Sequence, residues 1–466
     1  MILCVLPAKS AALRDKIQLA YYTEEVERLL KKRKANNKER GLAMIQGFVH
    51  PEFSPIADEL ARMIPADGRS GAAISVYHQG ECVVDLWGGC RDRAGNPWER
   101  DTLALSFSTT KGVESTLLHV LADQGLIDYN QPVKHYWPEF CQGGKSAITV
   151  AHLLTHQAGL YDIRSLIDDA SRMTDWEYMA HHLAAAAPCH APGSTHGYHG
   201  LTYGWLLGEL IQRVTGQSFA QVLKEQLADP LQLDGLYVGL PEEEFGRRAM
   251  LRSFPRSSQP KPTLESRRPM GPIRQFQSGV QRTLLKHASR WVTIDGFAML
   301  KGLVPHGIAR LSFNDDQVVS ACIPSANGMF TARSLARMYA MMANGGELDG
   351  VRLMSPQRVA LISQVRSRRF DKVVPLPMHW RLGYHRVFTT GPRTPNAFGH
   401  FGFQGSGAWC DPSRQLSLGF TVNSTAGSTP FGDARIAKLS ARAIEAVERM
   451  QGVRVLQRAG AIPYAS

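Results

Sequence analysis

The sequence lacks the residue spacings that hold metals or disulfide frameworks. Its seven cysteines are an odd, scattered number without a C-x-x-C pair, at positions 4, 82, 90, 141, 189, 322 and 410. Structural disulfides and zinc sites normally show paired spacings. We therefore expect reduced thiols that pack as small apolar side chains, no metal site and no cofactor.

The chain also lacks a long hydrophobic run. No stretch approaches the roughly 18 apolar residues that a membrane span needs. The apolar opening, residues 1–7, is too short for a secretory signal and has no basic residue before it. These features predict a cytoplasmic protein.

Nucleic-acid-binding character is missing too, although the formal net charge is +12. Much of the positive charge lies in residues 246–290, where eleven Lys or Arg stand against one acid, Glu265. This segment is rich in Pro and Ser, which predicts an irregular surface insertion. Aromatic residues are sparse in it, so we expect no nucleic-acid partner. A peripheral contact with an anionic membrane or partner stays open, as does the oligomeric state.

The composition is that of a folded, enzyme-sized protein, with 44% hydrophobic and 20% charged residues over 466 positions. That length indicates two intertwined subdomains or one domain with a large insertion. The predicted division is an N-terminal helical extension (1–50), an α/β subdomain (51–107 with 335–452), a mainly helical subdomain that includes the basic insertion (108–334) and a C-terminal tail (453–466).

Strand signals lie near both ends of the chain, with helical signals between them. Residues 72–87 are two β-rich runs around a Gln79-Gly80 turn, and residues 398–409 and 416–422 predict further strands. Helical periodicity covers residues 108–125, 150–225 and 332–342, and a closing helix is expected at 433–450. We therefore predict a mixed α/β (α+β) fold in which an antiparallel sheet, built from two distant segments, is flanked by helices and carries an inserted helical subdomain.

Two Ser-x-x-Lys motifs could supply a nucleophile. One is Ser258-Gln-Pro-Lys261, where the proline argues against a helix. The other, Ser108-Thr-Thr-Lys111, stands where a strongly patterned helix begins. On a helix, residues i and i+3 are neighbours, so a neutral lysine amine can take the serine proton. The alternative is that Ser108 only caps the helix and Lys111 is a surface residue.

Five ordered segments carry a resemblance that favours the catalytic alternative. They are residues 106–112, 122–140, 150–160, 198–208 and 399–407. The sequence resembles the serine β-lactamase and penicillin-binding-protein superfamily, most of all class C β-lactamases and family VIII carboxylesterases. The resemblance implies a β-lactamase/transpeptidase-like fold, with Ser108 as nucleophile and Lys111 as its base.

The resemblance also implies a catalytic tyrosine. Tyr198 stands where the family's Tyr-x-Asn motif begins, and Tyr203 is a rival. We expect Tyr198 to complete the triad, as phenolate or phenol, with the charge of Lys111 lowering its pKa. Gly200 replaces the asparagine, which in β-lactamases helps to hold the amide side chain of the drug.

The family's Lys-Thr-Gly motif corresponds to His400-Phe401-Gly402, on an expected edge strand. His400 and Gly402 are therefore predicted to contact substrate, and a neutral His400 would weaken recognition of a β-lactam carboxylate. The backbone N–H groups of Ser108 and Phe403 are the predicted oxyanion hole.

Two further motifs are expected to be structural. Ser325-Ala-Asn327 is interpreted as a loop, and His156 as a packing and hydrogen-bonding residue. The Gly-x-Ser-x-Gly motif of α/β-hydrolases is absent.

The leading functional prediction is a carboxylesterase that hydrolyses short to medium acyl esters through a Ser108 acyl-enzyme, with a small-molecule ester as its partner. A β-lactamase, a D-amino-acid peptidase and an acyltransferase remain alternatives because they share the acyl-enzyme chemistry. A non-catalytic sensor or binding module on the same fold is the more remote alternative.

Overall fold

The computed structural model describes residues 44–65, 68, 70–252, 296–425 and 433–459, with side chains up to residue 452. Most of the predicted N-terminal extension and of the basic insertion, and the end of the predicted tail, lie outside the described residues. Within them, no helix is long and apolar enough to cross a membrane.

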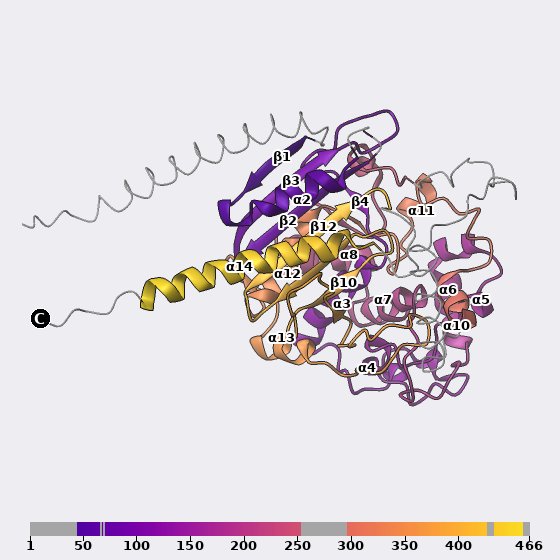
Figure 1. Cartoon of the computed structure of the whole chain (residues 1–466). Helices are drawn as coiled ribbons and strands as arrows, with labels where there is room; N and C mark the ends of the chain where they lie inside the picture. Colours follow the sequence, from indigo (N-terminus) through magenta and orange to yellow (C-terminus); the bar gives the residue numbers. More distant parts are fainter. Residues whose placement is uncertain (1–43, 66–67, 69, 253–295, 426–432, 460–466) are drawn as a thin grey trace, which may run out of the picture.

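A seven-stranded antiparallel sheet forms the centre of the α/β part (Figure 1). Its strand order is β1-β3-β2-β12-β11-β10-β9, so the first three strands come from the start of the chain and the others from its end. The strands are β1 (Ile45–Val49), β2 (Gly71–His78), β3 (Glu81–Gly89), β9 (His385–Arg386), β10 (Phe398–Phe401), β11 (Gly407–Asp411) and β12 (Leu416–Val422). This arrangement confirms the predicted fold class.

Successive side chains along each strand point to opposite faces of the sheet, and both faces are apolar. On β2, Ile74 and Val76 pack with the helices α2 (Pro55–Met63) and α14 (Arg435–Ala459) on one face. Tyr77 points to the opposite face, where the helices α12 (Ala332–Ala343) and α3 (Thr109–Asp123) lie. Figure 1 shows α14 running across the front of the sheet with α12 behind it. The sheet is thus a middle layer between helices.

The chain between the two sheet segments is mainly helical and packs on α3. Its helices are α4 (Val150–Leu154), α5 (Ile163–Leu166), α6 (Trp176–Ala185), α7 (Thr202–Thr215), α8 (Phe219–Leu223), α10 (Gly296–Leu303) and α11 (Asp316–Ser320), and α13 (Pro356–Ser363) follows α12. Short turns of helix complete it: η2 (Val133–His135), η3 (Pro138–Cys141), η4 (Ala170–Thr174), η5 (Lys224–Ala228) and η6 (Glu242–Arg247). A further turn, η1 (Pro51–Phe53), lies between β1 and α2. The small strands β4 (Ala104–Leu105), β5 (Leu236–Tyr237) and β6 (Met329–Phe330) form a second sheet, and β7 (Glu347–Leu348) pairs with β8 (Val351–Arg352).

Three predictions from the sequence are corrected by the structure. Residues 45–49, assigned to the extension, form the strand β1 because their backbone pairs with β3. The run 398–409 is two strands, β10 and β11, joined by a turn that contains Gly405 with φ 95°. The strand β10 is not at the edge, since the short β9 pairs with its outer side. The remaining subdomain boundaries stay a prediction.

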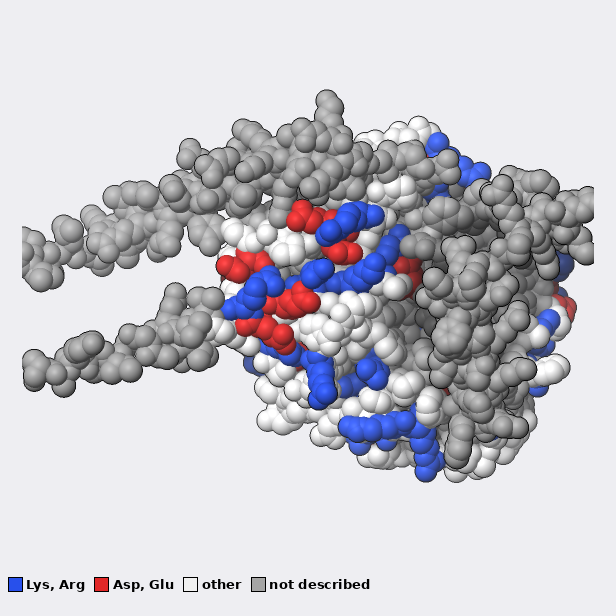
Figure 2. All heavy atoms as spheres, in the orientation of Figure 1, with Lys and Arg blue, Asp and Glu red and all other residues white. Residues whose placement is uncertain are grey.

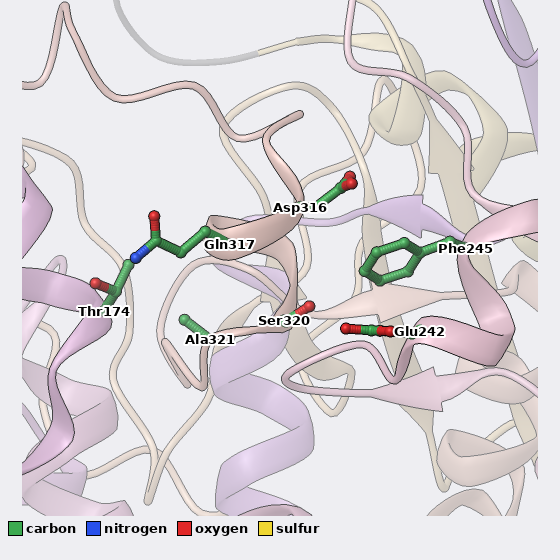
Figure 3. A pocket seen from close by; sticks show the side chains of 7 residues that line it. All are labelled: Thr174, Glu242, Phe245, Asp316, Gln317, Ser320 and Ala321. Carbon is green, nitrogen blue, oxygen red and sulfur yellow. The ribbon is translucent and has the colours of Figure 1, made fainter.

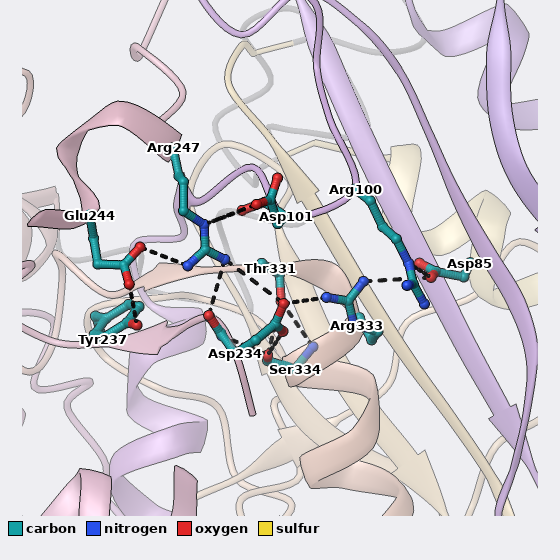
Figure 4. A network of polar contacts seen from close by, with 11 residues as sticks. Asp85, Arg100, Asp101, Asp234, Tyr237, Glu244, Arg247, Thr331, Arg333 and Ser334 are labelled. Carbon is teal, nitrogen blue, oxygen red and sulfur yellow. Dashed lines mark hydrogen bonds and ion pairs between the residues drawn. The ribbon is translucent and has the colours of Figure 1, made fainter. Parts of the chain in front are cut away.

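An ion-pair network joins the sheet to the helical part (Figure 4). Arg333 on α12 lies between Asp85 on β3 and Asp234, which precedes β5. Asp234 also faces Arg247, at the end of η6, and that guanidinium pairs with Glu244 at 2.7 Å. The network fixes α12 between the two parts of the molecule.

Candidate active site

Ser108 lies at the beginning of α3, held there by a strained residue. The preceding Phe107 has φ 44°, an unusual value for a bulky side chain. Its ring packs edge-on against Phe313, with the ring centroids 5.4 Å apart. Ser108 makes no side-chain hydrogen bond to the helix N-terminus. The capping alternative therefore fails, and the hydroxyl is left for other contacts.

Lys111 is completely buried one turn further along α3 and points at Ser108. Its Nζ lies 3.2 Å from Ser108 Oγ and donates hydrogen bonds to the carbonyls of Gly200 at 2.7 Å and Ser325 at 3.0 Å. Burial lowers the pKa of Lys111 to about 7, and the nearby Glu114 opposes this shift. A neutral amine has two N–H groups for the two carbonyls and one lone pair for the serine hydroxyl. In its neutral form Lys111 can thus accept a proton from Ser108, and its role as the catalytic base stays a prediction.

Tyr198 completes the group. Its ring lies under Lys111 Nζ, which is 5.1 Å from the ring centroid, and hydrogen-bonding contact with the Ser108 side chain acts to lower the pKa of its hydroxyl. The expectation that Lys111 lowers the pKa of Tyr198 is wrong, because burial raises that pKa and outweighs the Ser108 hydrogen bond. Tyr198 is thus a phenol at neutral pH, suited to pass a proton rather than to begin as a phenolate. The rival Tyr203 instead pairs with Ser115 at 2.7 Å.

His400 lies beside this group as a neutral imidazole. It is buried, stacks on Tyr198 with the ring centroids 6.2 Å apart, and its Nδ1 contacts the carbonyl of Phe401 at 3.3 Å. Burial together with His385 and Lys111 lowers the pKa of His400 well below its usual range. The structure shows no protein partner for His400 Nε2 among the described residues. With Nδ1 donating to Phe401, the Nε2 of His400 is an uncharged hydrogen-bond acceptor at the position where the family has a positively charged lysine.

The two proposed oxyanion donors lie at the same end of α3. Among the described residues, no hydrogen bond is found from the backbone N–H of Ser108 or of Phe403 to a protein acceptor. The ring of Phe403 is 70% exposed and packs on Phe107 with the centroids 6.0 Å apart. Gly402 permits this approach, since a Cβ there would lie 2.3 Å from the carbonyl oxygen of Ser106. The structure thus places Phe403 close to the nucleophile's segment, and the oxyanion hole stays a prediction.

The motifs interpreted as structural behave largely as expected. Asn327 closes its loop by donating to the carbonyls of Val318 and Ala321. His156 is buried and accepts a hydrogen bond from the backbone of His199 at 3.3 Å. The carbonyl of Ser325, which accepts a hydrogen bond from Lys111, could not be predicted from the sequence. A backbone oxygen carries no side-chain signal by which to find it.

The close packing around Gly200 could not be predicted from the sequence either. A Cβ at this position would lie 2.3 Å from Leu303 and 2.7 Å from the carbonyl of Gly302, both on α10. The contact joins residues about a hundred positions apart. The helix α10 thus fills the place where the family carries an asparagine side chain.

A separate hollow of about 660 Å³ lies between η6 and α11 (Figure 3). It is lined by Thr174, Glu242, Phe245, Asp316, Gln317, Ser320 and Ala321. None of the predicted site residues lines it, and one of its two carboxylates, Asp316, is paired with Arg248. The described residues contain no group of three or more His, Cys, Asp or Glu that could hold a metal ion.

The chain is similar in sequence to known proteins. A family model described as Beta-lactamase matches residues 45–443. The sequence is 36% identical to the esterase/beta-lactamase LipL of Mycobacterium tuberculosis, over 81% of this chain and 82% of that protein. It is 32% identical to the esterase EstB of Burkholderia gladioli, over 38% of this chain and 49% of that one.

Solved structures agree with the sequence matches. A family VIII carboxylesterase aligns with a TM-score of 0.72 at 34% identity, covering 87% of this chain and 99% of that one. A penicillin-binding-protein homologue from Caulobacter crescentus aligns with a TM-score of 0.71 at 34% identity, covering 86% and 99%.

Proposed function

This chain belongs to the β-lactamase family of serine hydrolases, and from that premise we propose that it is a carboxylesterase that hydrolyses short to medium acyl esters through an acyl-enzyme on Ser108. The observation that carries the catalytic part is the buried lysine, whose pKa of about 7 lets it remove the serine proton at neutral pH.

The proposed reaction has two steps. Neutral Lys111 takes the proton of Ser108 as Oγ attacks the ester carbonyl, and the oxyanion is bound by the backbone N–H groups of Ser108 and Phe403. Tyr198 passes a proton to the leaving alkoxide, and the alcohol departs. Protonated Lys111 then returns the serine proton to the Tyr198 phenolate, so both groups are neutral again. In the second step Lys111 takes a proton from water as the water attacks the ester to Ser108, and this proton is delivered to Ser108 Oγ as the acid departs.

Two features of the site favour an ester over a β-lactam. The position of the family's asparagine is Gly200, and α10 leaves no room there for an amide side chain. The position of the family's lysine is His400, whose lowered pKa leaves it uncharged, so it gives a β-lactam carboxylate no cation. An ester needs neither contact. The LipL relative is named as both an esterase and a β-lactamase, so β-lactam hydrolysis is the alternative to test.

The test compares p-nitrophenyl butyrate with nitrocefin. We expect Ser108-dependent ester hydrolysis with kcat/KM at least about a hundredfold above that for nitrocefin, the scale on which one lost polar contact in the transition state is felt. Ser108→Ala should abolish turnover, whereas Ser258→Ala, at the second Ser-x-x-Lys motif, should retain it. Unchanged hydrolysis by Ser108→Ala would refute the proposal, and a higher kcat/KM for nitrocefin would make the protein a β-lactamase.

A further inference from the structure

A buried carboxylate stands behind Tyr198. Asp371 lies in the loop between α13 and β9 and is 3% exposed. Its Oδ1 accepts hydrogen bonds from the backbone N–H groups of Tyr198 at 2.9 Å, Val373 at 2.8 Å and Val374 at 3.0 Å. Its Oδ2 accepts from the indole Nε1 of Trp380 at 3.2 Å. All four partners are donors, so the site matches an acceptor-only carboxylate.

These contacts hold Tyr198 from two directions. One oxygen fixes the Tyr198 backbone, and the other orients the indole on which the phenol ring rests. The rings of Tyr198 and Trp380 stack with their centroids 5.7 Å apart and an interplanar angle of 12°. Lys372 also donates its backbone N–H to the carbonyl of His196 at 3.0 Å, which joins the two loops side by side. The phenol therefore has little freedom to move relative to Ser108.

Asp371 and Tyr198 come from parts of the chain that are distant in sequence. Tyr198 belongs to the chain just before α7, whereas Asp371 comes from the chain that leads into the sheet strand β9. No element of regular secondary structure contains Tyr198, so its position depends on such tertiary contacts. A displacement of about 1 Å in a reacting group can cost a hundredfold in rate.

We infer that Asp371 is a positioning residue for catalysis, which places the hydroxyl of Tyr198 against Ser108 through the Tyr198 backbone and the Trp380 indole. It does not touch the substrate. This role rests on the proposed function, because it acts through the proton transfer that Tyr198 performs.

The test is a double-mutant cycle on ester hydrolysis. Asp371→Asn keeps one acceptor oxygen and the side-chain size but places an NH₂ group against the Trp380 N–H. We expect kcat to fall about ten- to a hundredfold with KM little changed, as for a displaced catalytic group. In a Tyr198→Phe background the same substitution should cause no further loss, because the group that it positions is already gone.

Two further variants keep the test decisive. Trp380→Phe keeps an aromatic ring but removes the indole donor and part of the buried ring, so it replaces Asp371→Asn in the cycle if that variant does not fold. Asp175→Asn is the matched control, since Asp175 caps α6 by accepting from Tyr178 and should leave kcat unchanged.

The outcomes separate this inference from the proposed function. An equal loss in the wild-type and Tyr198→Phe backgrounds, or no loss at all, would overturn the positioning role while ester hydrolysis stands. Absence of Ser108-dependent hydrolysis in the wild-type protein would instead overturn the proposed function and this role with it.

Discussion

Lys111 is the residue whose ionisation should set the pH dependence of the enzyme. Burial lowers its pKa to about 7, and only the deprotonated amine can accept the Ser108 proton. We therefore expect kcat/KM for an ester to rise with pH and to level off above an apparent pKa of about 7. The measurement is a pH profile under conditions where the fold is intact at both ends.

A substitution at Lys111 sharpens this prediction. Lys111→Arg keeps the positive charge but cannot lose it at these pH values, so activity should be abolished throughout the profile. A profile in the wild-type protein that falls as pH rises through about 7 would show that the charged amine is the active form.

The hydroxyl of Tyr198 is expected to act as a proton carrier. Tyr198→Phe retains the stack on Trp380, so we expect a fall in kcat of about 10²- to 10⁴-fold, the usual size of a general acid–base contribution. The matched control is Tyr203→Phe, which removes a hydroxyl bonded to Ser115 and should largely retain kcat. A larger loss at Tyr203 than at Tyr198 would assign the catalytic role to the rival residue.

At the scale of elements, α12 depends on a glycine for its approach to the sheet. A Cβ at Gly419 of β12 would lie 2.3 Å from the carbonyl oxygen of Ala332 and 2.7 Å from the nitrogen of Ala336. Close packing leaves no space to absorb it. The helix therefore rests directly on the backbone of β12.

Gly419→Ala should accordingly reduce the free energy of unfolding by about 1–3 kcal/mol, the typical cost of overpacking. Urea denaturation measures this change. Gly246→Ala is the control, because a Cβ at Gly246 meets nothing within 4 Å. If both variants unfold at the same urea concentration, the close contact between α12 and β12 is not present in solution.

At the scale of the whole molecule, the face drawn in Figure 2 carries charges of both signs. Around α14 and α2, Figure 2 shows basic and acidic side chains interspersed, and the pairs include Arg442 with Glu445 and Arg414 with Glu448. The segment 246–290, with its excess of basic residues, lies largely outside the described residues. Its contact with an anionic membrane or partner remains a prediction from the sequence alone.

The network of Figure 4 is expected to hold the sheet and the helical part together. Asp234→Asn removes the carboxylate that Arg333 and Arg247 share, so we expect a loss of about 1 kcal/mol in the free energy of unfolding. High salt screens such pairs, so the loss should shrink in concentrated NaCl. The exposed pair of Asp168 with Arg172 supplies the control variant Asp168→Asn, with little expected effect. Equal stability of Asp234→Asn and wild type at low salt would contradict this role.

Local patterns predicted many of the helices and strands, whereas the choice of Ser108 as the nucleophile also needed the family resemblance of five ordered segments and stays a prediction. The proximity of Ser108 and Lys111 follows from helical spacing, and the β-rich runs around turns at both ends of the chain indicate the antiparallel sheet. The contacts that complete the site are long-range and leave no local pattern. Asp371 lies 173 positions from Tyr198, and α10 meets Gly200 only in the folded chain. The direction of the Tyr198 pKa shift was mispredicted because burial and the charge of Asp371, neither of which the sequence shows, raise the pKa and outweigh the contact with Ser108.

Covalent labelling of Ser108 tests the central claim most directly. A fluorophosphonate probe should attach to one serine per chain, in the peptide that contains Ser108, and mass spectrometry of the digested protein locates it. The label should be lost in Ser108→Ala and retained in Ser258→Ala. A folded wild-type protein that stays unlabelled, or is labelled elsewhere, would contradict the account and favour a binding module without catalytic activity.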